Sequence, residues 1–136
     1  AYNVGVTDRL ICPLMDARRS QVYTGIYGYT DGMLDVIQPQ AAVSVTDLAQ
    51  TLNELGQETI LLGDGVPVYR EQLEQLLEIP HCYAPAHLNR QRAGAVAALA
   101  EIYYRAGKCE PAEEMAPEYL RKSQAERERE EREERQ

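Results

Sequence analysis

The dipeptide Asp31-Gly32 constrains the fold of this chain more strongly than any other feature of its sequence. A two-residue hairpin turn needs positive φ angles, which glycine adopts at little cost. The residues before it are rich in β-branched and aromatic side chains, so residues 21–30 are predicted to form a strand. One face of this strand carries Val22, Thr24 and Ile26, and the other carries Tyr23, Tyr27 and Tyr29. The chain is therefore expected to build a sheet around this hairpin.

Two further strands complete a predicted antiparallel meander. Residues 10–15 form a nearly continuous apolar run, in which Pro13 indicates an edge position or a bulge. The short polar segment 16–20 is typical of a hairpin connection. After the glycine turn, residues 33–37 continue as a third strand, which Pro39 is expected to end.

The middle of the chain alternates between helical and strand patterns. Ser44 and Asp47 give a capping signal for a helix that Gly56 should end. Residues 59–62 follow as a short apolar strand of the kind that is buried on both faces. A second helix should begin near Pro67, because proline is favoured in the first helical turn.

The remaining elements complete a recognisable order. Residues 81–86 are predicted to form a weak strand, and the alanine-rich residues 93–106 a helix that is expected to be largely buried. The order β-β-β-α-β-α-β-α predicts an α/β fold with a mixed sheet, as in a ribonuclease-H-like or actin-like (ASKHA) half-domain. Residues 1–122 are assigned to this domain. Residues 123–136 are assigned to a charged Glu/Arg tail that is expected to be flexible.

Composition narrows the class of protein. Charged residues make up 26% of the chain and hydrophobic residues 44%, as in an ordinary globular domain. The net charge of −8 argues against an autonomous nucleic-acid binder, because phosphate binding depends on clustered Lys and Arg. No apolar run is long enough to span a bilayer, and Cys12, Cys82 and Cys109 do not suggest a secreted disulfide framework. We therefore expect a cytoplasmic protein.

One pair of carboxylates supports an enzyme hypothesis. Asp16 ends the first predicted strand and Asp64 ends the fourth. In ribonuclease-H-type nucleases, carboxylates from neighbouring strands converge on two Mg²⁺ ions. A Mg²⁺-dependent nuclease is therefore the alternative function, although Asp at a strand end is more often a turn former and no third acidic residue clearly joins the pair.

Other chemical signals are weak. Gly63-Asp64-Gly65, between a strand and a helix, could hold a phosphate, but it lacks the spacing and the lysine of a P-loop. His81, Cys82, His87 and Cys109 are suitable zinc ligands by type, yet their spacing matches no familiar site. No Gly-x-Ser-x-Gly elbow is present. No catalytic residue, cofactor site or metal ligand is assigned.

Two segments near the ends of the chain resemble the bacterial TsaB (YeaZ) family. They are Asp16-Ala17-Arg18-Arg19 with Val22-Tyr23, and Pro117-Glu118-Tyr119-Leu120-Arg121. The resemblance extends over residues 10–126 and is looser at residues 62–65 and in the alanine-rich helix. The chain departs from the family pattern at Ser20-Gln21, where the family commonly has Gly-Glu.

The resemblance implies a role without catalysis. TsaB-like proteins take part in making threonylcarbamoyladenosine (t6A) beside the tRNA anticodon, together with the transferase TsaD and the ATPase TsaE. The chain resembles the carboxy-terminal half of such a protein, cut by design or by proteolysis, because the Gly-Pro-Gly-Ser-Phe-Thr-Gly-like loop of the amino-terminal lobe is missing. A homodimer is possible, tRNA would be reached only through partners, and the older M22 glycoprotease-like label finds no supporting residues.

Four residues are candidates for contact with a partner or with tRNA: Arg18, Arg19, Tyr119 and Arg121. The two arginines of the hairpin connection should be exposed, because burial would strand their charges. Tyr119 and Leu120 precede a highly charged tail, and we expect this apolar pair to pack back onto the domain.

Overall fold

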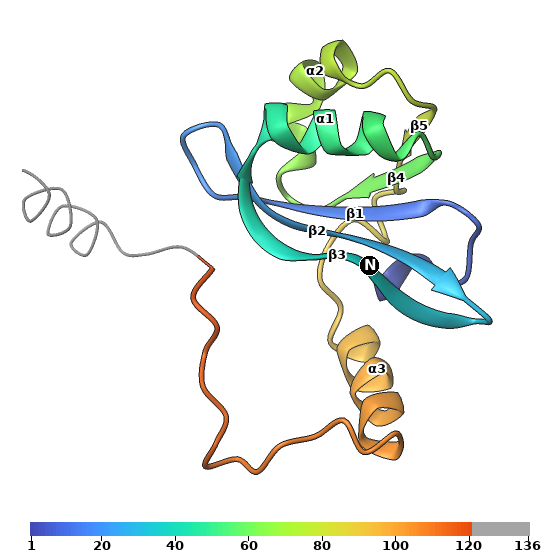
Figure 1. The fold of residues 1–136 in the computed structure, drawn as a ribbon, viewed down its shortest axis with the longest axis vertical. Coiled ribbons are helices and arrows are strands. Elements are labelled where there is room, and N and C mark those ends of the chain that lie inside the picture. Colours follow the sequence, from blue (N-terminus) through green and yellow to red (C-terminus); the bar gives the residue numbers. More distant parts are fainter. Residues whose placement is uncertain (121–136) are drawn as a thin grey trace, which may run out of the picture.

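The computed structural model describes residues 1–120, and these form a five-stranded mixed sheet with helices (Figure 1). The elements are η1 (Tyr2–Val4), β1 (Leu10–Asp16), β2 (Gln21–Thr30), β3 (Met33–Ser44), α1 (Val45–Leu55), β4 (Thr59–Leu62), α2 (Val66–Leu76), β5 (His81–Tyr83) and α3 (Ala93–Arg105). The predicted order of strands and larger helices is confirmed. The predicted boundary between domain and tail, at residues 122 and 123, lies outside the described residues.

The sheet has the strand order β3-β2-β1-β4-β5. β1, β2 and β3 form the predicted antiparallel meander, whereas β4 pairs with β1, and β5 with β4, in parallel. Asp31 and Gly32 have φ angles of 51° and 78°, and they connect the paired residues Thr30 and Met33. The hairpin prediction is therefore confirmed in its geometry.

The prediction that Pro39 ends the third strand is wrong. β3 continues through Pro39 to Ser44 and pairs with β2 along its length. β3 lies at the edge of the sheet, where a residue without an N–H group is tolerated. The pairing is also irregular at this point, because Gln38 faces Ile26 whereas Ala41 faces Thr24.

Pro13 does not mark an edge. β1 lies between β2 and β4, and Pro13 faces Leu62 in the parallel pairing. On its other side, β1 pairs with β2 at Ile11 and then at Leu14. Pro13 therefore lies in an interior strand, between two residues of β1 that pair with β2.

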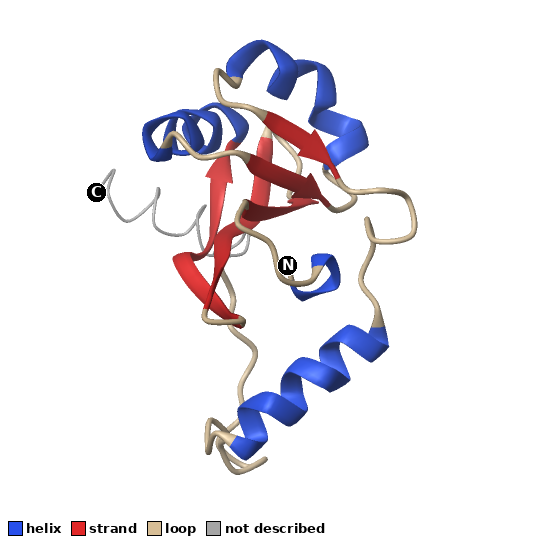
Figure 2. Cartoon of the chain, turned by 90° about the vertical axis from the view of Figure 1, so that its right-hand side faces the viewer, coloured by secondary structure: helices blue, strands red, loops and turns tan. Residues whose placement is uncertain are grey.

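One face of the sheet is covered by α1 and α2, as Figures 1 and 2 show. The Ser44 hydroxyl accepts a 3.0 Å hydrogen bond from the Asp47 N–H, and Gly56 ends α1 with a φ of 64°. Both predicted caps are therefore present. The main core lies between these helices and the sheet: Leu10, Cys12, Leu14, Val22, Ile26, Val45, Leu48, Ala49, Leu52, Leu61, Val66, Tyr69, Leu73, Leu77 and Ile79.

The prediction that the third helix is largely buried is wrong. α3 lies on the other side of the sheet from α1 and α2, and none of its residues is buried (Figures 1 and 2). It packs against the short helix η1, while Val96 is 66% exposed and Tyr104 is 72% exposed. An apolar sequence predicts burial only where an opposing surface is available, and residues 1–120 supply little of that surface here.

Within the described residues, no helix is both long and apolar enough to cross a membrane.

Candidate functional site

The hairpin tip, residues 17–20 between β1 and β2, has an unusual backbone. Arg18, Arg19 and Ser20 have φ angles of 64°, 56° and 56°, so three successive residues other than glycine are left-handed. This conformation is disfavoured by roughly 1–2 kcal/mol for each such residue. The tip must therefore be held by contacts from the rest of the fold.

The carboxylate of Asp16 supplies one of these contacts. Its Oδ1 atom accepts hydrogen bonds from the Arg18 backbone N–H and from the Tyr69 hydroxyl, each 2.8 Å long. The Tyr69 hydroxyl also lies 3.4 Å from the carbonyl oxygen of Gln21. Tyr69 belongs to α2, so this helix is joined directly to both ends of the hairpin tip.

Backbone hydrogen bonds close the tip and join it to α1. The Ala17 N–H donates to the Gln21 carbonyl over 3.0 Å, and the Gln21 N–H donates to the Arg18 carbonyl over 3.1 Å. The Ser20 carbonyl accepts a 3.0 Å bond from the N–H of Val45, the first residue of α1. Both helices of the covered face therefore hold the connection.

The shared hydrogen bonds perturb two acids. The Arg18 N–H, and then the Tyr69 hydroxyl, lower the pKa of the Asp16 carboxyl below its ordinary value. Burial, and then the bond to Asp16, raises the pKa of the Tyr69 phenol. The pair is therefore held as a carboxylate that accepts from a neutral phenol.

The arginine side chains of the tip are free of the core. Arg18 is 88% exposed, and its Nε lies 3.9 Å from Asp16 Oδ2, while Arg19 is also exposed. The connection projects from the body of the domain (Figure 1). The structure thus places both residues where a partner could reach them, and contact with a partner stays a prediction.

The two other candidate contact residues lie apart from the tip in the sequence. Tyr119 is 84% exposed, so the expectation that it packs onto the domain is wrong. Leu120 is half-buried, and Gln40 of β3 donates a side-chain hydrogen bond to Glu118, so the segment does touch the domain through polar groups. Arg121 lies outside the described residues.

The glycine-rich turn after β4 is a close backbone contact. Gly63 has a φ of 110°, and a Cβ atom at this position would lie 2.1 Å from the Leu14 carbonyl oxygen. The Gly65 N–H donates to that same oxygen over 3.0 Å, and the Gly63 N–H donates to Asn89 Oδ1 over 2.8 Å. Both N–H groups are therefore engaged, and the tight-turn interpretation describes them better than a phosphate cradle.

Within residues 1–120, the groups considered for the alternative nuclease and for zinc do not form a metal site. Asp64 is exposed, while Asp16 is engaged by Arg18 and Tyr69. His81 Nε2 lies 3.4 Å from Glu74, and Cys109 is exposed. Across residues 1–120, no group of three His, Cys, Asp or Glu residues is placed to hold a metal ion.

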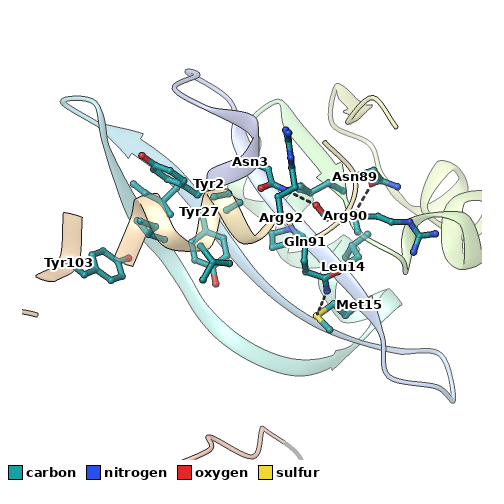
Figure 3. Close-up of a pocket in the computed structure, with 18 residues that line it drawn as sticks. Tyr2, Asn3, Leu14, Met15, Tyr27, Asn89, Arg90, Gln91, Arg92 and Tyr103 are labelled. Atoms are coloured by element: carbon teal, nitrogen blue, oxygen red, sulfur yellow. Dashed lines mark hydrogen bonds between the residues drawn. The ribbon is translucent and has the colours of Figure 1, made fainter. Parts of the chain in front are cut away.

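A cavity of about 350 Å³ lies on the open face of the sheet, between the strands, η1, the 89–92 loop and α3 (Figure 3). Its lining is mainly apolar and includes Leu14, Met15 and Tyr27 from the strands. Burial, and then Tyr103 of α3, raises the pKa of Tyr27. Sequence reasoning missed this cavity, because its walls come from distant segments. The tyrosine face of β2 was the available signal.

The chain was compared with known protein families and with curated proteins. No family model matches the chain. Over 122 residues, covering 88% of this chain and 50% of the other protein, it is 32% identical to "tRNA threonylcarbamoyladenosine biosynthesis protein TsaB" of Bacillus subtilis (strain 168). The resemblance to the TsaB family is confirmed. The chain spans about half the length of this curated relative.

Solved structures support the fold of this TsaB-like chain. A protein from Pseudomonas aeruginosa described as similar to the peptidase YeaZ superposes with a TM-score of 0.64 at 23% identity, over 84% of this chain and 50% of that one. YeaZ from Pseudomonas aeruginosa gives a TM-score of 0.60 at 21% identity, over 82% and 50%. The predicted α/β fold class, the ribonuclease-H-like and actin-like half-domain, is confirmed by this likeness.

Proposed function

We propose that this chain is half of a TsaB-like scaffold protein that serves t6A modification of tRNA without catalysing it. The observation that carries the proposal is the 32% identity to Bacillus subtilis TsaB across 88% of the chain. In this proposal the protein works in the cytoplasm with TsaD and TsaE, and tRNA is reached through these partners. The net charge of −8 favours such indirect contact.

The arrangement of polar groups supports a scaffold role. Asp16 is committed to the Arg18 N–H and the Tyr69 hydroxyl, and the glycine turn is committed to Leu14 and Asn89. These groups therefore serve the fold in the state observed. The competing nuclease function predicts Mg²⁺-dependent cleavage of RNA or DNA that disappears in Asp16→Asn, and that result would overturn the scaffold proposal.

The open face supports the idea of a half-protein. α3 presents apolar side chains without burying them, and the relatives in the comparison are about twice as long as the matched region. A second lobe packed against α3 would bury this surface. We therefore also propose that α3 contacts a second lobe of the longer protein.

A chimera tests the function directly. Residues 10–120 should replace the matching half of Bacillus subtilis TsaB in a strain that lacks its own TsaB, and t6A should be measured by mass spectrometry of tRNA nucleosides. We expect restored modification. The same chimera with Leu52→Asp, which places a charge in the core, is the negative control. A stably produced chimera that leaves the tRNA unmodified would contradict the proposal.

The isolated chain should behave differently from the chimera. In TsaB-like proteins the main TsaD contact resembles a helical bundle formed by amino-terminal lobes, so the 136-residue chain alone should bind TsaD weakly or not at all. It should also fail to restore modification. A pull-down that shows micromolar or tighter binding would assign a TsaD contact to this half.

A further inference from the structure

We propose that the hairpin tip is a pre-shaped docking point for an acidic protein segment, with Arg18 and Arg19 as the recognition residues and Tyr69 and Asp16 as the positioning residues. The inference goes beyond the role in tRNA modification, because it assigns a binding surface and a partner chemistry to one part of the chain. It does not depend on the proposed role in tRNA modification.

The first support is that hydrogen bonds from both helices hold the tip, although its backbone is intrinsically unfavourable. Arg18, Arg19 and Ser20 are all left-handed, and α2 holds them through the Tyr69–Asp16 bond. α1 holds them through the bond from Val45 to the Ser20 carbonyl. A loop that is already ordered loses little conformational entropy on binding, so it gains affinity from each contact it makes.

The second support is the composition of the surface beside the tip. Met15 and Tyr23 face each other across β1 and β2, one residue pair before the pair that ends the ladder. Met15 is 44% exposed and Tyr23 is half-buried, so both remain accessible on the open face. Arg, Tyr and Met are the residue types enriched in protein interfaces. The tip therefore combines two cations with an adjoining apolar area.

The third support is charge, which favours carboxylates over nucleic acid. Several arginines elsewhere already have acidic partners: Arg9 with Glu58, Arg70 with Glu74 and Arg105 with Glu101. Within residues 1–120, Arg19 has no acidic group within 4.0 Å, and Arg18 reaches only Asp16 at 3.9 Å. Two adjacent guanidinium groups match a short segment with a few carboxylates, whereas a nucleic-acid backbone needs a wider cationic surface than this acidic chain offers.

Tyr69 is the positioning residue that the geometry singles out. Its hydroxyl occupies Asp16 Oδ1, and the carboxylate therefore serves the backbone of the tip. In Tyr69→Phe this bond is lost, so Asp16 becomes free to draw the Arg18 guanidinium towards itself. The backbone of the tip should then lose its left-handed shape. The Arg18 guanidinium, held by Asp16, should no longer be available to a partner.

The test uses the full 136-residue chain and two labelled probes in a fluorescence anisotropy titration. One probe is a short peptide of alternating glutamate and leucine, and the other is a single-stranded RNA of equal charge. We expect saturable binding of the peptide, about tenfold weaker binding by the variant Arg18→Ala/Arg19→Ala, and unchanged binding by the charge-matched control Arg90→Ala/Arg92→Ala. Thermal unfolding should be nearly the same for all three proteins.

The role of Tyr69 has its own readout. Tyr69→Phe should weaken peptide binding by about threefold. Adding Asp16→Asn to Tyr69→Phe should restore part of the binding, because a neutral amide no longer draws the Arg18 guanidinium away from the peptide. A purely structural role of Tyr69 would not be repaired in this way.

Several results would overturn the proposal. They are the absence of saturable peptide binding, an equal loss in the Arg90/Arg92 control, an RNA preference that vanishes with Arg18 and Arg19, or a Tyr69→Phe protein that binds normally. The RNA result would make the tip a nucleic-acid contact. The peptide titration and the t6A chimera are independent, so failure of one is distinguishable from failure of the other.

Discussion

The two faces of the central sheet differ in what covers them. α1 and α2 seal one face, where Leu52, Leu61 and Leu73 are fully buried. On the other face lies the cavity, and Val36 of the edge strand β3, which pairs with Tyr27, is 51% exposed. β2 carries aliphatic side chains on one face and tyrosines on the other, so the position of the helices decides where burial stabilises the fold. The covered face should carry the stability, and the open regions the capacity to associate.

The largest expected contrast comes from shortening one side chain in each region. Leu52→Ala should lower the free energy of unfolding by about 2–5 kcal/mol, because it leaves a cavity in the sealed core. Val36→Ala, at a position that is 51% exposed, should change it by less than about 0.5 kcal/mol. Chemical denaturation measures both values. Equal losses would show that the open side is packed in solution.

Hydrogen exchange should reveal the same contrast in the helices. The amides of α1 should exchange only when the domain opens globally, because α1 buries Val45, Leu48, Ala49 and Leu52. α3 buries none of its residues, and short helices without packing are marginally stable in water. Its amides should therefore exchange orders of magnitude faster in native-state exchange followed by mass spectrometry. Slow exchange in α3 that depends on protein concentration would indicate that a second copy covers it.

The reactivity of the cysteines should also differ between the covered core and the exposed surface. Cys12 is fully buried on the covered face, and burial raises the pKa of its thiol to about 12. Cys109 is exposed. Iodoacetamide at neutral pH should therefore modify Cys109 readily and Cys12 only after unfolding, as peptide mass spectrometry can show. Rapid modification of Cys12 in the folded chain would contradict a sealed core.

The raised pKa of Cys12 also predicts a pH dependence. Its contribution to stability is fully present below about pH 9 and is lost as pH rises toward about 12, because the unfolded chain releases the thiol proton first. Burial and Glu74 raise the pKa of Tyr83 to about 12, which adds to the same trend. Thermal unfolding between pH 8 and pH 11 should therefore show a falling midpoint.

The smallest expected effect lies at the hairpin tip, which both helices of the covered face support. Ser20 has a φ of 56°, and glycine adopts this conformation without the penalty of a side chain. Ser20→Gly should raise the free energy of unfolding by about 0.5–1 kcal/mol. Ser44→Gly, which removes the α1 cap, is a useful opposite control, because it should not stabilise the protein. A loss of stability in Ser20→Gly would show that the Ser20 side chain has a role of its own.

Much of the fold was predictable because its signals are local. Asp31-Gly32, the Ser44 cap and Gly56 each act on the residues beside them, and all three lie where the pattern placed them. Pro39 misled the prediction, because a missing N–H group ends a strand only if that group is needed. The burial of α3 was also misjudged, because apolar composition does not say what lies opposite a helix.

The exposure of the hairpin tip was predictable from the sequence, whereas its geometry was not. The exposed positions of Arg18 and Arg19 followed from a polar connection between two strands. The left-handed backbone of three residues did not, because only glycine gives a clear signal for positive φ. The one hint of the left-handed backbone was that the TsaB family commonly has glycine at position 20, where this chain has serine. The bond from Tyr69 to Asp16 joins residues distant in sequence, so no local pattern could reveal it.

The position of β1 also has a consequence for the order in which the chain folds. β1 meets β2 through a short hairpin, whereas it meets β4 only after β2, β3 and α1 have been added to the chain. Hairpins form within about 1–10 μs, and pairing across a long intervening segment pays more loop-closure entropy. We expect the meander to assemble early and the β1–β4 pairing to limit the folding rate. Until β4 docks, the inner edge of β1 is the place where a nascent chain is most open to misassociation.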